Sequence, residues 1–581
     1  MKNFKLLMIY LLSFNSTFAI NYFVDKANGS DFNSGLTTAN AFKTIQKAAN
    51  TAQAGSTIFI KAGTYFENVT ISTSGTAGNP IIFRNFNSDA VFIDGTGTST
   101  ANDTAMLRIN GASHLEFRNL TIQNLLCQDA NGIVVLTDPN IGTTDLKFIN
   151  ITIHDIKWTA LPTTIPTTND NAHPFLVYGF GETQAKAITN VLVDGCNIYN
   201  NVTGFSENLT HSGNVDGFVV QNNLVHDNNN IGIECEGNYA ASPVPALDHA
   251  RNGLVKNNKC YNNTCPYSSA AGIYVDGGWD IIVERNECYN NSYGVEVGCE
   301  ENGTTKNITV KNNIFYNNRE SGVYLGGYDV ATTGQVLNTT IRNNTFFQNN
   351  STNSSVGEIE ISKASNCRIE NNIFYVNNTK VLYNLNNIVP QINNAFDYNC
   401  YFTPNNNQSD VIIYYSGTGF NNFNAYKTTT NQDIHSIYGD PLFVNAAPLI
   451  GLDLNLQPTS PCINIGNPTI FLPNELDFIG NIRALNGLDI GAYEFQGNLI
   501  TNNFLSNNEI KIYPNPVVDF VNIESKMEIN SVAIYNEIGR LVSTNDEIFS
   551  KIDISNLNSG IYLMKINFKN DKVEVVKMLK L

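Results

Sequence analysis

A repeated segment constrains this chain more than any other feature of its sequence. The segment reads Val-Gln-Asn-Asn at residues 220–223, and related copies recur up to residues 369–372. Aligned on the last Asn, the copies are spaced by 35, 28, 27, 31 and 28 residues. Short alternating strands at such a period predict a solenoid, in which each strand pairs in parallel with its copy one coil away. The aligned residues are Asn223, Asn258, Asn286, Asn313, Asn344 and Asn372.

The columns of the repeat predict which side chains face inward. An apolar side chain or Cys stands two residues after each aligned Asn, and Leu120, Ile151 and Cys196 extend the Asn column backward. Asn tolerates a bent backbone, and stacked Asn amides can hydrogen-bond along the solenoid axis. The ten cysteines show no metal-binding spacing. Because Cys260 and Cys288 share one inward column, we expect core thiols rather than a bridge.

The start of the repeat predicts a cap. Phe42, Ile45, Ala48, Ala49 and Ala52 recur at helical spacing ahead of an alternating apolar strand. A short amphipathic helix is therefore expected to cover the open first coil, whose backbone groups would otherwise lack partners.

These features resemble the right-handed parallel β-helix proteins of the pectate-lyase-like superfamily. The resemblance runs from Phe23-Val24-Asp25 through Gly63-Thr64-Tyr65 and the Asn-Asn coils to about Phe495. It implies an all-β fold, a right-handed parallel β-helix with an N-terminal capping helix and a C-terminal cap. Such a resemblance is specific for the fold and only weakly specific for the reaction.

The N-terminus has the pattern of a secretory signal peptide. Lys2 and Lys5 precede an apolar stretch at residues 6–12, and small residues at Thr17 and Ala19 suit a cleavage site. We expect the signal peptide to span residues 1–19, with a buried N-terminal strand as the alternative.

The C-terminus has the pattern of a separate module. After an Asn- and Ser-rich linker at residues 498–508, alternating strands separated by turns predict a small β-sandwich over residues 509–581. Segments such as Lys511-Ile512-Tyr513-Pro514-Asn515-Pro516 resemble the C-terminal sorting domain of the Bacteroidetes type IX secretion system. This resemblance implies the type IX machinery as a partner, and passage across the outer membrane. The β-helix domain then spans residues 20–497, and a carbohydrate-binding module is the alternative for the last segment.

Charge and hydropathy exclude some partners. The chain carries 34 Lys and Arg against 51 Asp and Glu, a net charge of −17, which argues against nucleic acid or an anionic membrane. Beyond the N-terminal segment, no apolar run reaches the ~18 residues that a membrane helix needs. We expect a monomer that is secreted or attached to the cell surface, without a transmembrane span.

Two outward columns carry acidic residues. With Ile273 and Val275 inward, the alternation of a strand turns Tyr274 and Asp276 outward. Asp276 and Glu296 then stand on adjacent coils, where crowded carboxylates need a proton, a cation or a ligand. The first column reads Glu234, Tyr274, Glu296, Tyr324 and then Glu360, and the second reads Glu236, Asp276, Gly298 and Gly326.

This acidic face is either a solvated surface or a binding site. Tyr274, Tyr324 and Trp279 flank it with rings on which sugars could stack, which favours a site. Long insertions at residues 155–190 and 237–252 border it, and the second carries His249 and Arg251 as candidate substrate-binding residues.

Cleavage of an extracellular polysaccharide is the leading interpretation. Two carboxylates can hydrolyse a glycosidic bond, with ~5–5.5 Å between them for retention and ~6.5–9.5 Å for inversion. The segments around Asp276 and Glu296 are similar to β-helix glycosidases of xylosidase type, which implies Asp276 as nucleophile and Glu296 as acid/base. We assign Glu236 the role of keeping these charges apart. A hydrolase of this kind needs no metal.

Two alternatives remain open. A polysaccharide lyase could hold Ca²⁺ on Glu236, Asp276 and Glu296, with His249, Arg251 or Tyr274 as the base that attacks a uronic acid. A non-catalytic protein that binds glycans along the solenoid is the other.

Overall fold

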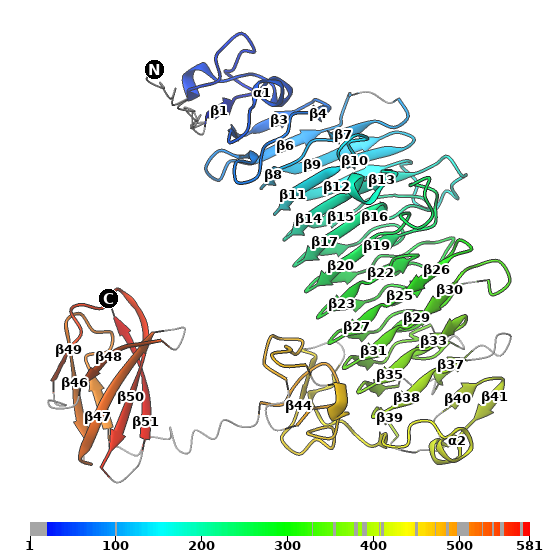
Figure 1. Ribbon diagram of the computed structural model, residues 1–581, viewed down its shortest axis with the longest axis vertical. Coiled ribbons are helices and arrows are strands. Elements are labelled where there is room, and N and C mark those ends of the chain that lie inside the picture. The colour runs from blue at the N-terminus through cyan, green and yellow to red at the C-terminus, as the bar shows by residue number, and fades with distance from the viewer. Residues whose placement is uncertain are drawn as a thin grey trace, which may run out of the picture. The chain divides into compact units, whose positions relative to one another are not determined.

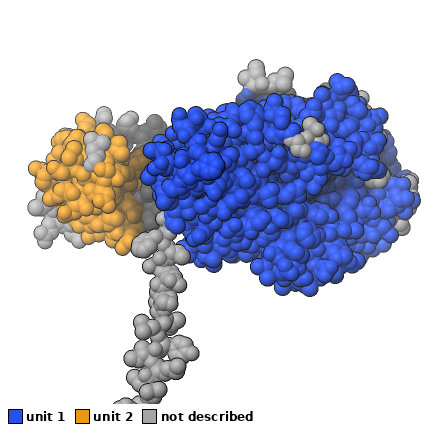
Figure 2. Space-filling view, turned by 90° about the horizontal axis from the view of Figure 1, so that it is seen from above, with its two compact units in different colours: residues 1–495 blue, residues 496–581 orange. Residues whose placement is uncertain are grey.

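The computed structural model describes residues 20–580, except for residues 99–100, 328, 353–355, 377–380, 386–391, 406, 408–411, 448–450, 471, 484–486, 497–509, 526, 537–539, 546–550 and 570–572. The chain forms two compact units, Met1–Phe495 and Gln496–Leu581, which Figure 2 colours separately. The expected signal peptide at residues 1–19 and the expected linker at residues 498–508 lie outside the described residues.

The first unit is a parallel β-helix, as expected from the repeat. Its strands form three sheets of 13 strands each, in which neighbours are separated by one coil. Figure 1 shows these strands stacked from the blue N-terminal coils to the yellow-green ones near residue 400. Each coil visits the first, the second and then the third sheet. The pairing is parallel throughout, apart from an antiparallel contact between the last two strands of the third sheet.

The strands of the first sheet are β1 (Asn21–Val24), β2 (Thr57–Ile60), β5 (Ile81–Asn85), β8 (Leu115–Arg118), β11 (Thr143–Ile149), β14 (Ile188–Asp194), β17 (Val215–Gln221), β20 (Arg251–Lys256), β23 (Ile282–Glu284), β27 (Thr309–Lys311), β31 (Thr340–Arg342), β35 (Arg368–Glu370) and β38 (Ala395–Asp397). Those of the second are β3 (Gly63–Tyr65), β6 (Val91–Asp94), β9 (Thr121–Leu126), β12 (Thr152–Lys157), β15 (Asn197–Tyr199), β18 (Leu224–His226), β21 (Lys259–Tyr261), β24 (Glu287–Tyr289), β28 (Ile314–Tyr316), β32 (Thr345–Phe347), β36 (Ile373–Tyr375), β39 (Cys400–Phe402) and β42 (Ile437–Tyr438). Those of the third are β4 (Val69–Ile71), β7 (Ala105–Asn110), β10 (Ala130–Leu136), β13 (Ala172–Gly179), β16 (Leu209–Gly213), β19 (Ile233–Glu236), β22 (Ala271–Asp276), β25 (Tyr293–Gly298), β29 (Val323–Leu325), β33 (Ile359–Ile361), β37 (Val381–Leu385), β40 (Ile412–Tyr415) and β41 (Thr418–Phe420). A short outer sheet joins β26 (Thr304–Lys306), β30 (Gln335–Leu337) and β34 (Ala364–Ser365).

The Asn-Asn pairs turn the chain from the first sheet to the second. The first Asn of a pair adopts the left-handed conformation, with φ of 56° at Asn222 and 55° at Asn257. The second Asn is buried, and its amide joins the coils, since Asn223 Nδ2 donates to Asn258 Oδ1 at 2.9 Å. Asn258 Nδ2 donates in turn to Asn286 Oδ1 at 3.0 Å. The predicted ladder is confirmed, and the two properties of Asn are divided between neighbouring residues.

A second Asn ladder lies at the next turn, between the second and third sheets. Asn228 Nδ2 donates to Asn263 Oδ1 at 3.0 Å, and Asn263 continues to Asn291 at 3.2 Å. The ladder ends at Asn349, whose Nδ2 donates to Glu358 at 2.7 Å. The coils between Asn228 and Asn349 are thus bonded at two turns, which fixes the register of the third sheet there.

Stacked apolar side chains fill the solenoid. Phe346 is fully buried, and its ring centre lies 5.2 Å from that of Phe315 and 4.6 Å from that of Phe374. Cys260 and Cys288 are paired in register, and all ten cysteines are buried free thiols, as expected.

Helices lie at both ends of the core. Helix α1 (Ile45–Thr51) buries Ile45, Ala48 and Ala49 in the core, with Thr44 as its N-cap. Helix α2 (Phe423–Thr430) buries Phe423 and Tyr426 in the same core, and Asn422 caps it.

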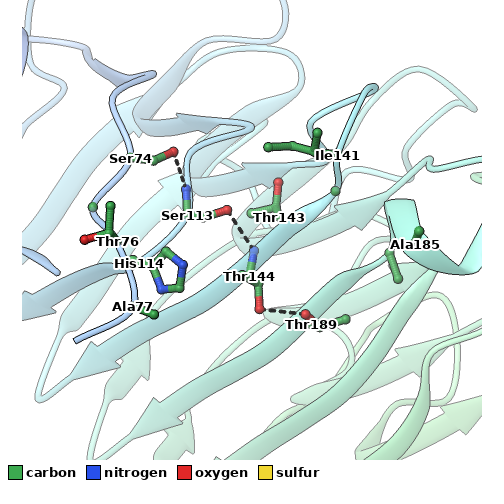
Figure 3. Close-up of a pocket in the computed structure, with 13 residues that line it drawn as sticks. Ser74, Thr76, Ala77, Ser113, His114, Ile141, Thr143, Thr144, Ala185 and Thr189 are labelled. Carbon is green, nitrogen blue, oxygen red and sulfur yellow. Dashed lines mark hydrogen bonds between the residues drawn. The ribbon is translucent and has the colours of Figure 1, made fainter. Parts of the chain in front are cut away.

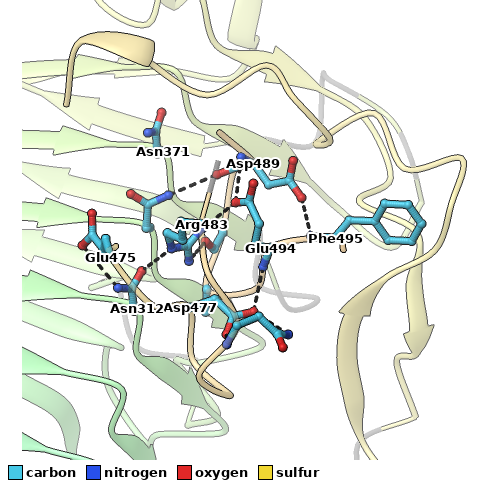
Figure 4. A network of polar contacts seen from close by, with 12 residues as sticks. Asn312, Asn371, Glu475, Asp477, Arg483, Asp489, Glu494 and Phe495 are labelled. Carbon is cyan, nitrogen blue, oxygen red and sulfur yellow. Dashed lines mark hydrogen bonds and ion pairs between the residues drawn. The ribbon is translucent and has the colours of Figure 1, made fainter. Parts of the chain in front are cut away.

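The end of the first unit folds back against the coils through a buried polar network (Figure 4). This segment includes β43 (Phe443–Asn445) and β44 (Asp453–Leu456). Arg483 is 1 % exposed, donates to Asn312 Oδ1 and the Gly491 carbonyl at 2.8 Å each, and pairs with Glu494 at 3.3 Å. A buried guanidinium needs such partners because its desolvation is costly.

The second unit contains two antiparallel sheets around one apolar core, as expected for a small β-sandwich. One sheet contains β45 (Ile510–Tyr513), β46 (Phe520–Ser525) and β49 (Lys551–Asp553), and the other β48 (Leu541–Asn545), β47 (Ile529–Asn536), β50 (Gly560–Phe568) and β51 (Val573–Lys580). Among the described residues of both units, no helix is long and apolar enough to cross a membrane.

Candidate active site

The third sheet carries the first acidic column in the predicted register, and in the second column Asp276 pairs with Gly298. Glu234 pairs with Tyr274, Tyr274 with Glu296, and Glu296 with Tyr324. Glu360 follows Tyr324 on the next coil. The strand alternation therefore places these side chains on one outward face.

The prediction that this face is exposed was wrong. Glu234 is 3 %, Asp276 0 % and Glu296 8 % exposed, and Tyr274 and Tyr324 are buried as well. The physical reason is that loops from several coils fold over the sheet. These loops bring further acidic and aromatic side chains to the columns. The acids of the columns therefore lie buried between the sheet and the loops.

Asp276 is held from two of these loops. The Tyr239 hydroxyl donates to Asp276 Oδ2 at 2.5 Å, and the Glu300 backbone N–H donates to Asp276 Oδ1 at 2.8 Å. Gly298 lies between Asp276 and Glu300 in the sequence. A side chain at this position would place its Cβ 2.8 Å from the Tyr274 hydroxyl oxygen. The glycine of the second column thus leaves room for the Tyr274 ring.

Burial and crowding change the protonation of the acids. Burial, with Glu300 and Asp276 nearby, raises the pKa of Glu296 well above its ordinary value. Burial together with Glu300 likewise raises the pKa of Asp276, against the hydrogen bond from Tyr239. Burial with Glu207 nearby raises the pKa of Glu236 to about 8. Burial and mutual repulsion thus favour the protonated forms of these acids.

Glu207 and Glu234 form the back of the cluster. Burial raises the pKa of Glu207 to about 7, and Thr210 donates to its Oε2 at 3.1 Å. Burial raises the pKa of Glu234 too, with Glu207 and Glu236 adding repulsion. Oε2 of Glu234 is buried without a hydrogen-bond partner among the described residues.

A pocket of about 460 Å³ opens beside these acids. Glu296 and Glu300 both line it, and Glu300 is exposed at its edge. The ring of Tyr293 stacks on that of Tyr324, with 5.2 Å between their centres. The pocket is lined by Phe205, Asn230, Ile231, Ser268, Ser269, Tyr293, Glu296, Glu300 and Tyr324.

His249, Arg251 and Trp279 lie together outside this lining. The ring centres of His249 and Trp279 are 3.5 Å apart, and His249 Nδ1 lies 2.7 Å from the Gly277 carbonyl. Arg251 donates to Asn214 Oδ1 at 2.8 Å. These contacts attach the 237–250 loop to the solenoid, and none of the three residues lines the pocket.

The residues that a calcium lyase would use do not form a cation site. Within the described part of the chain, no three His, Cys, Asp or Glu side chains converge as ligands of a metal ion. Glu236, Asp276 and Glu296 are therefore not arranged as a ligand set.

A second pocket of about 500 Å³ over the N-terminal coils has a structural explanation (Figure 3). The Ser113 N–H donates to Ser74 Oγ and the Thr144 N–H to Ser113 Oγ, each at 3.0 Å. Thr189 Oγ1 donates to Thr144 Oγ1 at 2.7 Å. These hydroxyl groups join successive coils, and none of the described residues that line this pocket carries a carboxylate.

Sequence reasoning missed Glu207, Tyr239 and Glu300. Glu300 follows Glu296 and Gly298 at the two-residue step of a strand, so the alternation continued past Gly298 would have found it. Glu207 and Tyr239 lie in loops, whose course no periodic pattern specifies.

The second unit matches a family model described as a secretion system C-terminal sorting domain, over residues 511–580. This domain marks proteins that type IX secretion exports to the cell surface or the extracellular space. The protein is therefore an exported one, as the C-terminal motifs predicted.

The rest of the chain has a relative that covers most of it. The chain is 32% identical over 476 residues to the uncharacterized protein YwoF of Bacillus subtilis. The aligned region covers 76% of this chain and 92% of YwoF. The chain belongs to the family of YwoF. It is also 33% identical over 132 residues to pectate lyase PEL9 of Emericella nidulans, 21% of this chain and 32% of that protein.

Several solved structures are similar to this YwoF relative at low sequence identity. Pectate lyase Pel9A has a TM-score of 0.42 at 14% identity, covering 82% of this chain and 96% of Pel9A. The complex of XylC with xylose has a TM-score of 0.43 at 12% identity, with 73% and 87% covered. Lacto-N-biosidase of Eubacterium ramulus has a TM-score of 0.40 at 12% identity, with 68% and 65% covered.

Proposed function

We propose that this protein is an exported glycoside hydrolase whose working carboxyl groups are Glu296 and Glu300. The observation that carries the proposal is that both line one pocket, in different environments. Glu296 is 8 % exposed and has a raised pKa, which suits a general acid. Glu300 is exposed at the pocket edge, where it can reach a sugar or a water. Partial burial of its carboxyl group raises the pKa of Glu300 too, and the hydrogen bond from Tyr239 opposes that rise.

The reaction divides between these two groups. Protonated Glu296 gives its proton to the glycosidic oxygen as the bond to the anomeric carbon breaks. Glu300 either attacks the anomeric carbon or takes a proton from the attacking water. If Glu300 attacks, water then breaks the glycosyl ester that forms on Glu300 and gives a proton back to Glu296. If Glu300 acts as the base, the water attacks the anomeric carbon directly, and its second proton goes to Glu300.

Asp276 takes a positioning role in this proposal. The resemblance to β-helix glycosidases implies Asp276 as nucleophile, but this residue is 0 % exposed and does not line the pocket. Its two hydrogen bonds instead fix the Glu300 backbone and the Tyr239 ring. Glu236 and Glu234 hold further protons behind it, which limits repulsion in the cluster.

Elimination by a lyase is the second candidate, and the local identity with pectate lyase PEL9 favours it. A lyase must neutralise the carboxylate of a uronic acid with a cation. Neither Lys nor Arg lines the pocket, and the acids do not form a cation site among the described residues. Hydrolysis is therefore the better-supported reaction.

A panel of plant, algal and animal polysaccharides tests the proposal. Hydrolysis releases reducing ends without the ultraviolet absorbance of an unsaturated uronic acid, whereas elimination produces both. Glu296→Gln and Glu300→Gln should each lower turnover by about a hundredfold or more. Glu301→Gln, at the neighbouring exposed carboxylate, is the matched control and should stay active. Binding without turnover by wild type would identify a glycan-binding protein instead.

A further inference from the structure

The pocket beside Glu296 offers hydrogen-bond acceptors and lacks cationic donors. Glu296 and Glu300 line it, and none of its described lining residues is a Lys, Arg or His. Ser269 also lines it, but its hydroxyl donates to Glu320 Oε1 at 2.7 Å and so is already used. The Tyr324 hydroxyl donates to the Gly327 carbonyl at 2.9 Å. Protonated Glu296 and the Ser268 hydroxyl can each donate one hydrogen bond, and the remaining acceptors need donors from a ligand.

Asn230 gives an independent indication of the same ligand. It lines the pocket, is 3 % exposed, and its Oδ1 has no hydrogen-bond partner among the described residues. Its Nδ2 donates to the Ser206 carbonyl at 3.0 Å. If the amide oxygen and nitrogen were interchanged, the Asn230 oxygen would face the Ser206 carbonyl oxygen without a hydrogen between them, so the orientation given is the favourable one. A buried acceptor without a donor is costly, and a ligand hydroxyl or ammonium group would remove that cost.

The charge around the pocket excludes an acidic ligand group. Glu320 and Glu360 add to the field at Glu296, and burial with Glu320 nearby raises the pKa of Glu360 to about 8. A further carboxylate here would meet the charge of Glu300 and Glu320, and none of the described residues that line the pocket is a cation that would offset it.

On the proposed function, we infer that the pocket selects a sugar ring without a carboxylate, one of whose donor groups bonds Asn230 Oδ1. The substrate class is thus a neutral or amino-sugar glycan, and Asn230 is a specificity-determining residue. Polymers of uronic acids are excluded.

Binding of simple sugars to the exported protein tests this without requiring turnover. Glucose, galactose, their 2-amino forms and their uronic acids are titrated by saturation-transfer NMR in the presence of a chelator. The neutral or amino sugars should bind about tenfold or more tightly than the matching uronic acids. Equal or tighter binding of the uronic acids, or no binding of any sugar, would overturn the inference.

Monodeoxy sugars test the role of Asn230. Wild type should bind one monodeoxy analogue about tenfold more weakly than the parent sugar, because that analogue lacks the donor. Asn230→Gly removes the acceptor and suits the backbone, since φ is 66° at this position. It should bind the parent sugar and that analogue equally, which a general loosening of the pocket would not produce. Asn262→Gly, at φ 54° and outside the pocket, is the control that should keep the wild-type preference.

The outcomes separate this inference from the proposed hydrolysis. Selective binding of neutral or amino sugars without cleavage of any glycan supports the inference and contradicts the hydrolase. Hydrolysis of a glycan together with tight uronic acid binding keeps the hydrolase and overturns the inference. An unchanged preference in Asn230→Gly overturns the assignment of Asn230.

Discussion

The hydroxyl group of Tyr239 lies 2.5 Å from Oδ2 of Asp276 and so ties a loop to the end of strand β22. The same hydroxyl is 3.5 Å from Glu300 Oε2. Oδ2 of Asp276 and Oε2 of Glu300 are therefore at most about 6 Å apart. Two unscreened negative charges at that distance repel each other strongly. One phenol thus links the buried acid to the acid at the pocket edge.

Tyr239→Phe should lower turnover by about tenfold or more, because Asp276 loses a donor and Glu300 loses part of its support. Steady-state kinetics on the glycan identified by the panel measures the effect, which should lie in kcat rather than KM. Tyr261→Phe, on the outer face of the second sheet, is the control. Unchanged kcat in Tyr239→Phe would contradict a positioning role for Asp276.

The pH dependence of turnover should show Glu296 on its alkaline side. Because its pKa is raised, Glu296 stays protonated to a higher pH than an ordinary glutamate, and activity falls as the pH rises through that pKa. The pH profile of kcat/KM measures this limb. A profile that already declines near pH 4 to 5, the range of an ordinary glutamate, would contradict Glu296 as the acid.

His211→Phe should stabilise the protein. His211 is 0 % exposed, both ring nitrogens lack hydrogen-bond partners among the described residues, and its ring stacks on Phe218 at 4.4 Å. Burial lowers its folded-state pKa to about 3. In the unfolded chain the imidazole binds a proton below about pH 6.5, whereas in the folded protein it stays neutral down to about pH 3. The free energy of unfolding is therefore not reduced by His211 above about pH 6.5, and it decreases as the pH falls toward 3.

Denaturant unfolding at pH 7.5 and pH 5 measures this difference. His211→Phe should unfold at a higher midpoint than wild type at both pH values, and should lose less stability on acidification. His226→Phe is the control, since His226 is partly exposed and pairs with Asp227 at 2.6 Å. A larger loss of stability on acidification in His211→Phe would mean that this imidazole is not the buried neutral base.

Phe346→Ala should cost about 3–5 kcal/mol, since it leaves a cavity between Phe315 and Phe374. Asn313→Ala should cost less but remain measurable, about 1–3 kcal/mol. The substitution removes the hydrogen bonds of Asn313 to Asn286 and Asn344. These neighbours are buried, so water cannot supply the lost partners. Thermal unfolding of both variants checks the order, and a neutral Phe346→Ala would contradict the inward column.

Removal of residues 498–581 should leave the β-helix folded. The two units have separate apolar cores, so the first does not depend on the second for burial. Cooperative thermal unfolding of the truncated protein is the expected result. A broad, non-cooperative transition would contradict the boundary at Gly497.

The repeat by itself determined the solenoid and the facing of its side chains. A side chain's direction in a strand depends on the parity of its position, so the column from Glu234 to Glu360 could be aligned from the spacing alone. The second Asn ladder was equally readable, in the recurring Asn pairs such as Asn262-Asn263 and Asn290-Asn291.

Only the tertiary structure decided whether these columns are exposed and which acids share a pocket. Tyr239, Glu207 and Phe205 reach the sheet from loops whose paths depend on contacts with other coils, and such contacts leave no period in the sequence. The same loops bury Asp276 and leave Glu300 at the pocket edge. Parity gives the direction of a side chain, whereas its protonation and its access to a substrate depend on what covers it.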